Sequence, residues 1–130
     1  MCIFCKIING EIPSKKVYED DDVLAILDIS QATVGHTLVM PKKHYANILE
    51  IPQNEYQKVM VKVKEISEKL NKKLNPKGIN ILNNCGEVAG QTVMHYHVHI
   101  LPRYNDSDLK IEFTDHSSNV NLDEILKNIQ

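Results

Sequence analysis

The sequence predicts an α+β fold in which one main helix and a short C-terminal helix pack on an antiparallel sheet of about five strands. A long amphipathic stripe in residues 53–74 indicates the main helix, and short apolar runs separated by turn residues indicate the strands. The chain has 130 residues, of which 42% are hydrophobic and 25% charged. These values are ordinary for a globular protein, so we expect residues 1–130 to form a single domain.

The N-terminal part of the chain supplies the first strands. Residues 2–14 mix apolar side chains with Gly10 and Pro13, which predicts a turn-rich lead-in. Three consecutive aspartates at 20–22 form a turn between two strands, and a proline stops the third strand. The predicted strands are 17–19, 23–28, 36–41, 79–82 and 94–101.

The main helix is predicted over residues 53–74, because its apolar side chains follow the i, i+3, i+4, i+7 spacing of one helical face. The segment Asn75-Pro76-Lys77-Gly78 ends it, since proline cannot extend the hydrogen-bond ladder and glycine permits a reversal. Residues 104–120 are polar and unpatterned, and we expect a loop there. A closing helix is predicted over 121–129, where the apolar positions are Leu122, Ile125, Leu126 and Ile129.

Composition narrows the class of partner. The net charge is −2, and the lysine-rich stretch 58–73 is interrupted by Glu65 and Glu68, which is typical of a solvated helix face. We therefore expect no nucleic acid as a partner. No segment has the length or hydrophobicity of a secretory signal or a membrane span, and three cysteines do not make a closed disulfide framework. A reducing cytoplasm is the expected location, with no membrane partner.

The segment His95-Tyr96-His97-Val98-His99 carries most of the functional information. Side chains alternate along a strand, so the three histidines should share one face, while Met94, Tyr96, Val98 and Ile100 should pack under the helix. Three structural histidines on a wet sheet face are the alternative. Because a row of imidazoles packs poorly in an apolar core, we expect these histidines to form a functional site.

A single metal ion held by all three histidines is disfavoured by the expected geometry. At about 3.3 Å per residue, His95 and His99 are anchored about 13 Å apart. A zinc ion needs its nitrogen ligands at about 2.1 Å, so it could take two neighbouring members more easily than three. At least one imidazole is then free for other chemistry. Imidazole titrates near neutrality and attacks phosphorus well, which suggests a phosphohistidine intermediate with neighbouring imidazoles as phosphate or proton partners.

The middle histidine is the expected nucleophile. A phosphate above His97 can be reached by His95 from one side and by His99 from the other. The preceding loop, residues 84–92, contains two glycines that let backbone amides approach an anion, and Asn84 and Thr92 add side-chain donors. A glycine-bearing hairpin without a ligand is the alternative for this loop.

Cys2 and Cys5 form a Cys-x-x-Cys pair, which is half of a tetrahedral zinc site. His44 and His95 are the candidates to complete it. Two free thiols beside a flexible start are the alternative.

The segment Gln91-Thr92-Val93-Met94-His95-Tyr96-His97-Val98-His99-Ile100-Leu101 resembles the His-x-His-x-His signature of the histidine-triad (HIT) family. Two upstream segments, Asp28-Ile29-Ser30-Gln31-Ala32 and Gly35-His36-Thr37-Leu38-Val39-Met40-Pro41-Lys42-Lys43-His44, resemble two further blocks of that family in the same order. The resemblance covers about residues 2–103 and none of 104–130. The branch that it resembles is the nucleoside phosphoramidate hydrolases, in the type that contains Cys-x-x-Cys.

The resemblance implies a HIT-like fold and cleavage of a purine nucleoside 5′-phosphoramidate to the monophosphate through a nucleotidyl intermediate on His97. It also implies that His99 and His36 contact phosphate or assist the leaving group, and that Asp28 and Ile29 bind the nucleoside. The resemblance further implies that the glycine loop, with Asn84, Gly90, Gln91 and Thr92, binds the phosphate. A structural zinc on Cys2, Cys5, His44 and His95 is implied for this type.

Two rival functions stay open from the sequence: a dinucleoside polyphosphate hydrolase, and a non-catalytic nucleotide- or zinc-binding interaction module. The expected assembly is a homodimer. The resemblance carries most of that expectation, and one short sheet with a free edge beside an apolar helix flank agrees with it.

Overall fold

The computed structural model describes residues 1–130 and contains one antiparallel sheet with strand order β1-β2-β3-β5-β4. The strands are β1 (Lys16–Glu19), β2 (Val23–Leu27), β3 (Thr37–Pro41), β4 (Gly78–Leu82) and β5 (Val98–Arg103). The α-helices are α1 (Ile3–Ile8), α2 (Gln53–Leu74) and α3 (Leu122–Ile129), and two short 3₁₀ turns are η1 (Glu87–Ala89) and η2 (Ser117–Asn119). The predicted α+β class and five-stranded sheet are confirmed.

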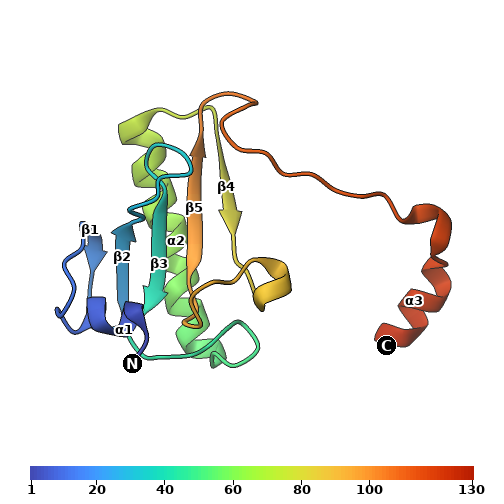
Figure 1. Cartoon of the computed structure of the whole chain (residues 1–130), viewed down its shortest axis with the longest axis horizontal. Helices are drawn as coiled ribbons and strands as arrows, with labels where there is room; N and C mark the ends of the chain where they lie inside the picture. The colour runs from blue at the N-terminus through green and yellow to red at the C-terminus, as the bar shows by residue number, and fades with distance from the viewer.

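The long helix α2 lies along one face of the sheet (Figure 1). Its buried stripe of Val59, Val63, Ile66 and Leu70 packs against strand residues that include Val39 and Val98. The helix spans the predicted residues because nothing interrupts this stripe before Asn75. Asn75 ends the helix in the left-handed conformation, with φ of 53°, and its N–H bonds back to the Asn71 carbonyl.

The opposite face of the sheet is covered at the N-terminus, where the sequence predicted only a turn-rich lead-in. That prediction was wrong, because residues 3–8 form the short helix α1. The Cys2 side chain caps it by accepting a hydrogen bond from the Cys5 N–H at 3.2 Å. Phe4 then packs in a second apolar cluster with Leu24, Ile26, Leu38 and Met40. Strands β2 and β3 are therefore buried on both faces of the sheet.

The predicted strand 94–101 begins later than expected. β5 starts at Val98, and residues 94–97 lie outside the ladder. The Tyr96 N–H bonds to the Tyr45 carbonyl at 2.6 Å, so this stretch is held by the loop before α2 and not by a neighbouring strand. The histidine row thus straddles the start of a strand.

The last part of the chain stands apart from the sheet. After β5 the chain makes a turn and then runs outward beyond β4 to α3 (Figure 1). No residue from 110 to 130 is buried. The predicted loop and closing helix are present here, and Asn121 caps α3 by accepting from the Glu124 N–H. No helix of the chain is long and apolar enough to cross a membrane.

Candidate active site and metal site

The histidine row separates two environments, as its alternation predicts. Tyr96, Val98 and Ile100 are buried with α2 in the main core. His95 and His97 are buried on the other side, at 0% and 7% exposure, and His99 is half-buried. The ring of Phe4 lies edge-on to His97, with 4.9 Å between ring centroids. Helix α1 therefore forms a lid over part of the row.

Hydrogen bonding fixes the tautomer of His97. Its Nδ1 lies 2.7 Å from the His95 carbonyl oxygen, which can only accept, so Nδ1 carries the proton. The other ring nitrogen, Nε2, is left with a free lone pair. Burial lowers the pKa of His97, although the His95 carbonyl and the charge of Asp28 act in the opposite direction. Burial is the largest of these effects and favours the neutral ring, and the bond to the His95 carbonyl leaves the lone pair of that neutral ring on Nε2.

His36 and His99 form a hydrogen-bonded chain beside His97. The Ala32 N–H donates to His36 Nδ1 at 3.2 Å, so the neutral His36 ring carries its proton on Nε2. That proton is donated to His99 Nδ1 at 2.8 Å. His99 therefore carries its own proton on Nε2. Burial, followed by the neighbouring rings of His97 and His36, lowers the pKa of His99 to about 4.

Asp28 also approaches this chain, with Oδ2 at 3.6 Å from His36 Nε2. Asp28, His36 and His99 are close enough to suggest a three-ligand metal site. A metal there would need the lone pair of His36 Nε2 and would force a proton onto Nδ1, against the Ala32 N–H. The hydrogen bonds thus favour a proton chain over a metal at this position.

The histidines open into a pocket of about 400 Å³ between α1 and the ends of β2 and β3. Five of the predicted site residues line it: Asp28, Ile29, Thr92, His97 and His99. Most of the wall is apolar, and polar and titratable side chains make up the rest. Such a pocket suits a ligand that combines an apolar ring with an anionic group.

The loop that enters the histidine row is braced by its own side chains. Gly86 and Gly90 have positive φ values of 92° and 96°, which favour glycine. Asn84 donates to the Gly90 carbonyl at 3.2 Å. Gln91 is buried and uses its amide on the Ala46 and Val93 carbonyls and on the Gly86 N–H. Asn84, Gly90 and Gln91 do not line the pocket, and they shape the loop that presents Thr92.

Several pocket residues were missed by sequence reasoning. Phe4, Ile7, Ile12, Pro13 and Ser14 make the wall contributed by the N-terminal segment. The signal that could have found them is the capping Cys2 followed by apolar residues at helical spacing. Asn83 was also missed, and its side chain holds the His97 carbonyl at 2.9 Å.

Cys2, Cys5, His44 and His95 meet at the N-terminus of α1, as predicted from the sequence. The six distances among the two Sγ and the two Nδ1 atoms all lie between 3.2 and 3.6 Å. A tetrahedral zinc site has ligand–ligand edges of about 3.4 to 3.8 Å, given bonds of about 2.3 Å to sulfur and 2.0–2.1 Å to nitrogen. The four donor atoms therefore form a tetrahedron of nearly the required size.

Outer hydrogen bonding also suits a metal at these four residues. His95 Nε2 donates to the Pro41 carbonyl at 2.8 Å, which leaves the lone pair on Nδ1 and directs it at the two sulfurs. The three cysteines are free thiols. Soft thiolate and imidazole donors in this number are typical of structural zinc.

Comparison with known sequences shows which family has this arrangement of residues. The HIT domain model matches residues 9–106. An uncharacterised HIT-like protein of Methanocaldococcus jannaschii is 55% identical over 130 residues, covering 100% of this chain and 99% of its own. The adenosine 5′-monophosphoramidase of Schizosaccharomyces pombe is 41% identical over 81% of this chain and 76% of its own. An adenylylsulfatase of Arabidopsis thaliana is 44% identical over 78% of this chain and 52% of its own.

Comparison with solved structures points to the same family. A HIT family protein of Bacillus subtilis superposes with a TM-score of 0.92 at 46% identity, covering 98% of this chain and 94% of that one. A zinc-bound histidine triad protein of Mycobacterium smegmatis superposes with a TM-score of 0.80 at 35% identity, covering 91% of this chain and 86% of that one. With the family model matching most of the chain and the histidine row in place, this protein belongs to the histidine-triad (HIT) family.

Proposed function

We propose that this chain is a nucleotide hydrolase that cleaves purine nucleoside 5′-phosphoramidates to the monophosphate through a nucleotidyl intermediate on His97. The observation that carries the proposal is the tautomer of His97, whose bond to the His95 carbonyl leaves the Nε2 lone pair at a pocket large enough for a nucleotide. The phosphoramidase named among the relatives supports the choice of substrate class.

The reaction would run in two displacements. In the first, His97 Nε2 forms a bond to the α-phosphorus while the bond from phosphorus to the leaving nitrogen breaks. The leaving nitrogen takes the electron pair and a proton from the imidazolium form of His99, which the bound phosphate anion would stabilise; His99 becomes neutral as His97 gains the positive charge. In the second, water attacks phosphorus and returns a proton to His99 as the bond to His97 breaks. The monophosphate and the amine are the products.

Binding would use both the apolar and the polar side chains of the pocket. The apolar wall of Phe4, Ile7 and Ile29 would hold the base and sugar, while Asp28 would accept from the ribose hydroxyls. Thr92 and the histidine protons would face the phosphate. His36 would act through His99, because its only proton is donated to that ring.

The test is to trap the intermediate. The protein is mixed with adenosine 5′-phosphoramidate, quenched in acid-free denaturant within milliseconds to seconds, and measured by intact mass spectrometry. We expect an added AMP on the wild-type protein and none on His97→Ala. Parallel turnover of diadenosine polyphosphate and adenylyl sulfate separates the rival activities. Binding of AMP without turnover of any of these substrates would instead indicate an interaction module.

We propose a structural zinc on Cys2, Cys5, His44 and His95, supported by the tetrahedral arrangement of their donor atoms and by the zinc-bound relative. When bound, the metal would hold α1 against the histidine row. A role in the chemical steps is not expected, because His95 Nδ1 faces the two sulfurs and its Nε2 is bonded to the Pro41 carbonyl.

We also propose a homodimer formed through the free edge of β4. This strand ends the sheet, and its Ile81 and Leu82 are exposed. Beside it, α2 and β4 enclose an apolar groove of about 490 Å³ that contains Met60, Val63 and Ile79. A second β4 would pair with the open backbone groups, and a second α2 would cover the groove.

A further inference from the structure

The C-terminal arm, defined as residues 110–130, is an amphipathic element with nothing packed on it. Leu122, Ile125, Leu126 and Ile129 follow the i, i+3, i+4, i+7 spacing and form one apolar stripe along α3. All four are exposed, and Phe113 on the same arm is 92% exposed. Surface stripes of this kind are usually covered by another element.

Helix α3 is also too short to stand alone. It contains 8 residues, and isolated helices below about 12–15 residues are marginal in water even with good sequences. The Asn121 cap closes its N-terminus but supplies no packing. The helix therefore needs a surface that accepts its apolar stripe, and its own body does not provide one (Figure 1).

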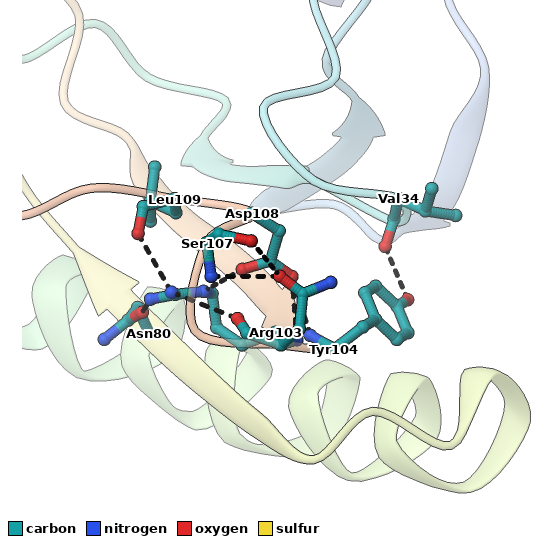
Figure 2. Close-up of polar contacts among 8 residues, drawn as sticks. Val34, Asn80, Arg103, Tyr104, Ser107, Asp108 and Leu109 are labelled. Atoms are coloured by element: carbon teal, nitrogen blue, oxygen red, sulfur yellow. Dashed lines mark hydrogen bonds and ion pairs between the residues drawn. The ribbon is translucent and has the colours of Figure 1, made fainter.

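A cluster of hydrogen bonds around Arg103, called here the Arg103 cluster, fixes where the arm leaves the body (Figure 2). The Arg103 guanidinium contacts the Asp108 carboxylate, donates to Asn80 Oδ1 at 2.7 Å and donates to the Leu109 carbonyl at 2.9 Å. Asp108 accepts from the Tyr104 N–H at 2.7 Å. Because Asn80 belongs to β4, the Arg103 cluster connects the start of the arm to the edge strand of the sheet.

A second anchor holds the same turn from the opposite side. The Tyr104 hydroxyl donates to the Val34 carbonyl at 2.7 Å, which connects the turn to the loop before β3 (Figure 2). From this fixed exit the arm runs outward past β4 (Figure 1). It thus extends over the side of the molecule where a second sheet would continue.

The superposition on the Bacillus subtilis protein extends over 98% of this chain and so includes most of the arm. Residues 110–130 make up about a sixth of this chain, and a superposition that lost them could not reach a TM-score of 0.92 over 98% of the chain. An extended arm that touches nothing of its own body would not take one position in two proteins that share 46% identity. Something outside the chain holds it.

We infer that the arm packs on a second copy of this chain, with the apolar stripe of α3 seated on the partner's body and the two arms exchanged symmetrically. This inference rests on the homodimer proposed above, because the arm crosses the β4 edge at which that dimer forms. The contacts around Arg103 agree with exchange, since an arm that must reach a neighbour needs a defined direction where it leaves the body.

The first experiment separates exchange from folding back. Protein grown in ¹⁴N medium and protein grown in ¹⁵N medium, both with a photo-crosslinking residue in place of Lys127, are mixed, dissociated, reassociated and irradiated. We expect crosslinked peptide pairs between the arm and the body that contain one light and one heavy member. Pairs that are always both light or both heavy would show that the arm folds on its own body and would overturn the inference.

The second experiment measures the energetic role of the stripe. Leu126→Asp places a charge in the stripe, and Asn128→Asp places the same charge on the opposite side of the same helix as the matched control. By analytical ultracentrifugation we expect Leu126→Asp to raise the dimer dissociation constant at least tenfold and Asn128→Asp to leave it within twofold. If both variants form dimers with the same dissociation constant, the exchange of arms is overturned while the homodimer stands. A wild-type monomer at tens of micromolar overturns the homodimer and the inference together.

Discussion

Truncating Phe4 to alanine tests whether α1 is a packed wall of the site. Phe4 is 7% exposed and fills the cluster formed by Leu24, Ile26, Leu38 and Met40, with its ring edge-on to His97. Phe→Ala changes in cores cost about 3–5 kcal/mol. We expect about 3 kcal/mol here, the low end, because α1 is a short peripheral helix that can relax. For a chain of this size that corresponds to a melting temperature lower by about 10 °C.

The same change should alter the chemistry of His97. Burial is the largest cause of its lowered pKa, and water admitted in place of the Phe4 ring would raise that pKa toward its usual value. His97 must be unprotonated to attack, so the acid limb of kcat/KM should move to higher pH. The assays are thermal unfolding and the pH–rate profile with adenosine 5′-phosphoramidate.

Ile3→Ala is the matched control, because Ile3 lies on the same helix and is 49% exposed. It should lose less than about 1 kcal/mol and leave the acid limb in place. If Phe4→Ala were no less stable than Ile3→Ala and its pH profile were unchanged, α1 would not be the packed wall that the geometry describes.

Three further outcomes are expected. His97→Ala should lower turnover by several orders of magnitude while retaining AMP binding by calorimetry, whereas His116→Ala on the exposed tail should behave as wild type. Cys5→Ser should lose zinc by elemental analysis and melt roughly 10 °C lower while keeping much of its turnover, and Cys85→Ser should keep the metal; full zinc content in Cys5→Ser would rule out this ligand set. Stability should fall on acidification, because the pKa of His99 is lowered to about 4 and the unfolded chain binds a proton between that value and about 6.5 that the folded chain does not. The full shift corresponds to about 2 kcal/mol at pH 5, which we discount to about 1 kcal/mol because solvent reaches part of the ring. His99→Gln should therefore show a smaller difference in melting temperature between pH 7.5 and pH 5, and an unchanged difference would contradict the pKa argument.

The elements with an uninterrupted apolar pattern were predictable from the sequence. Helix α2 occupies residues 53–74 as predicted, since its stripe has no break and Asn75 and Pro76 end it. The alternation correctly placed Tyr96, Val98 and Ile100 under α2, but the same prediction was wrong for Met94, which is 38% exposed. The alternation did not predict where β5 begins. Alternation shows on which face each side chain lies, whereas a strand also needs backbone hydrogen bonds to a neighbouring strand. Tyr96 finds its partner in Tyr45, 51 positions earlier in the sequence and outside any strand.

The site was predictable where one residue type carries the chemistry. The donor atoms of Cys2, Cys5, His44 and His95 meet as expected, because few other roles bring thiols and imidazoles together. The N-terminal wall was missed because Gly10 and Pro13 suggested turns, and the capping role of a cysteine is unusual. The place of Gln91 was not predictable in the same way. The resemblance put it in the phosphate loop, whereas the structure buries its side chain and uses it on backbone groups that brace that loop.

Helix α1 belongs to two sites at once, since Cys2 and Cys5 lie at its start while Phe4 and Ile7 form the pocket wall. Undocking this six-residue helix would dismantle the tetrahedron of donors and open the pocket in one event. Two ligands that both favour the docked state must strengthen each other's binding by the same factor. If both proposed sites are filled, zinc and nucleotide would therefore be thermodynamically coupled through α1. Removing the metal should weaken nucleotide affinity without changing any residue that touches the nucleotide.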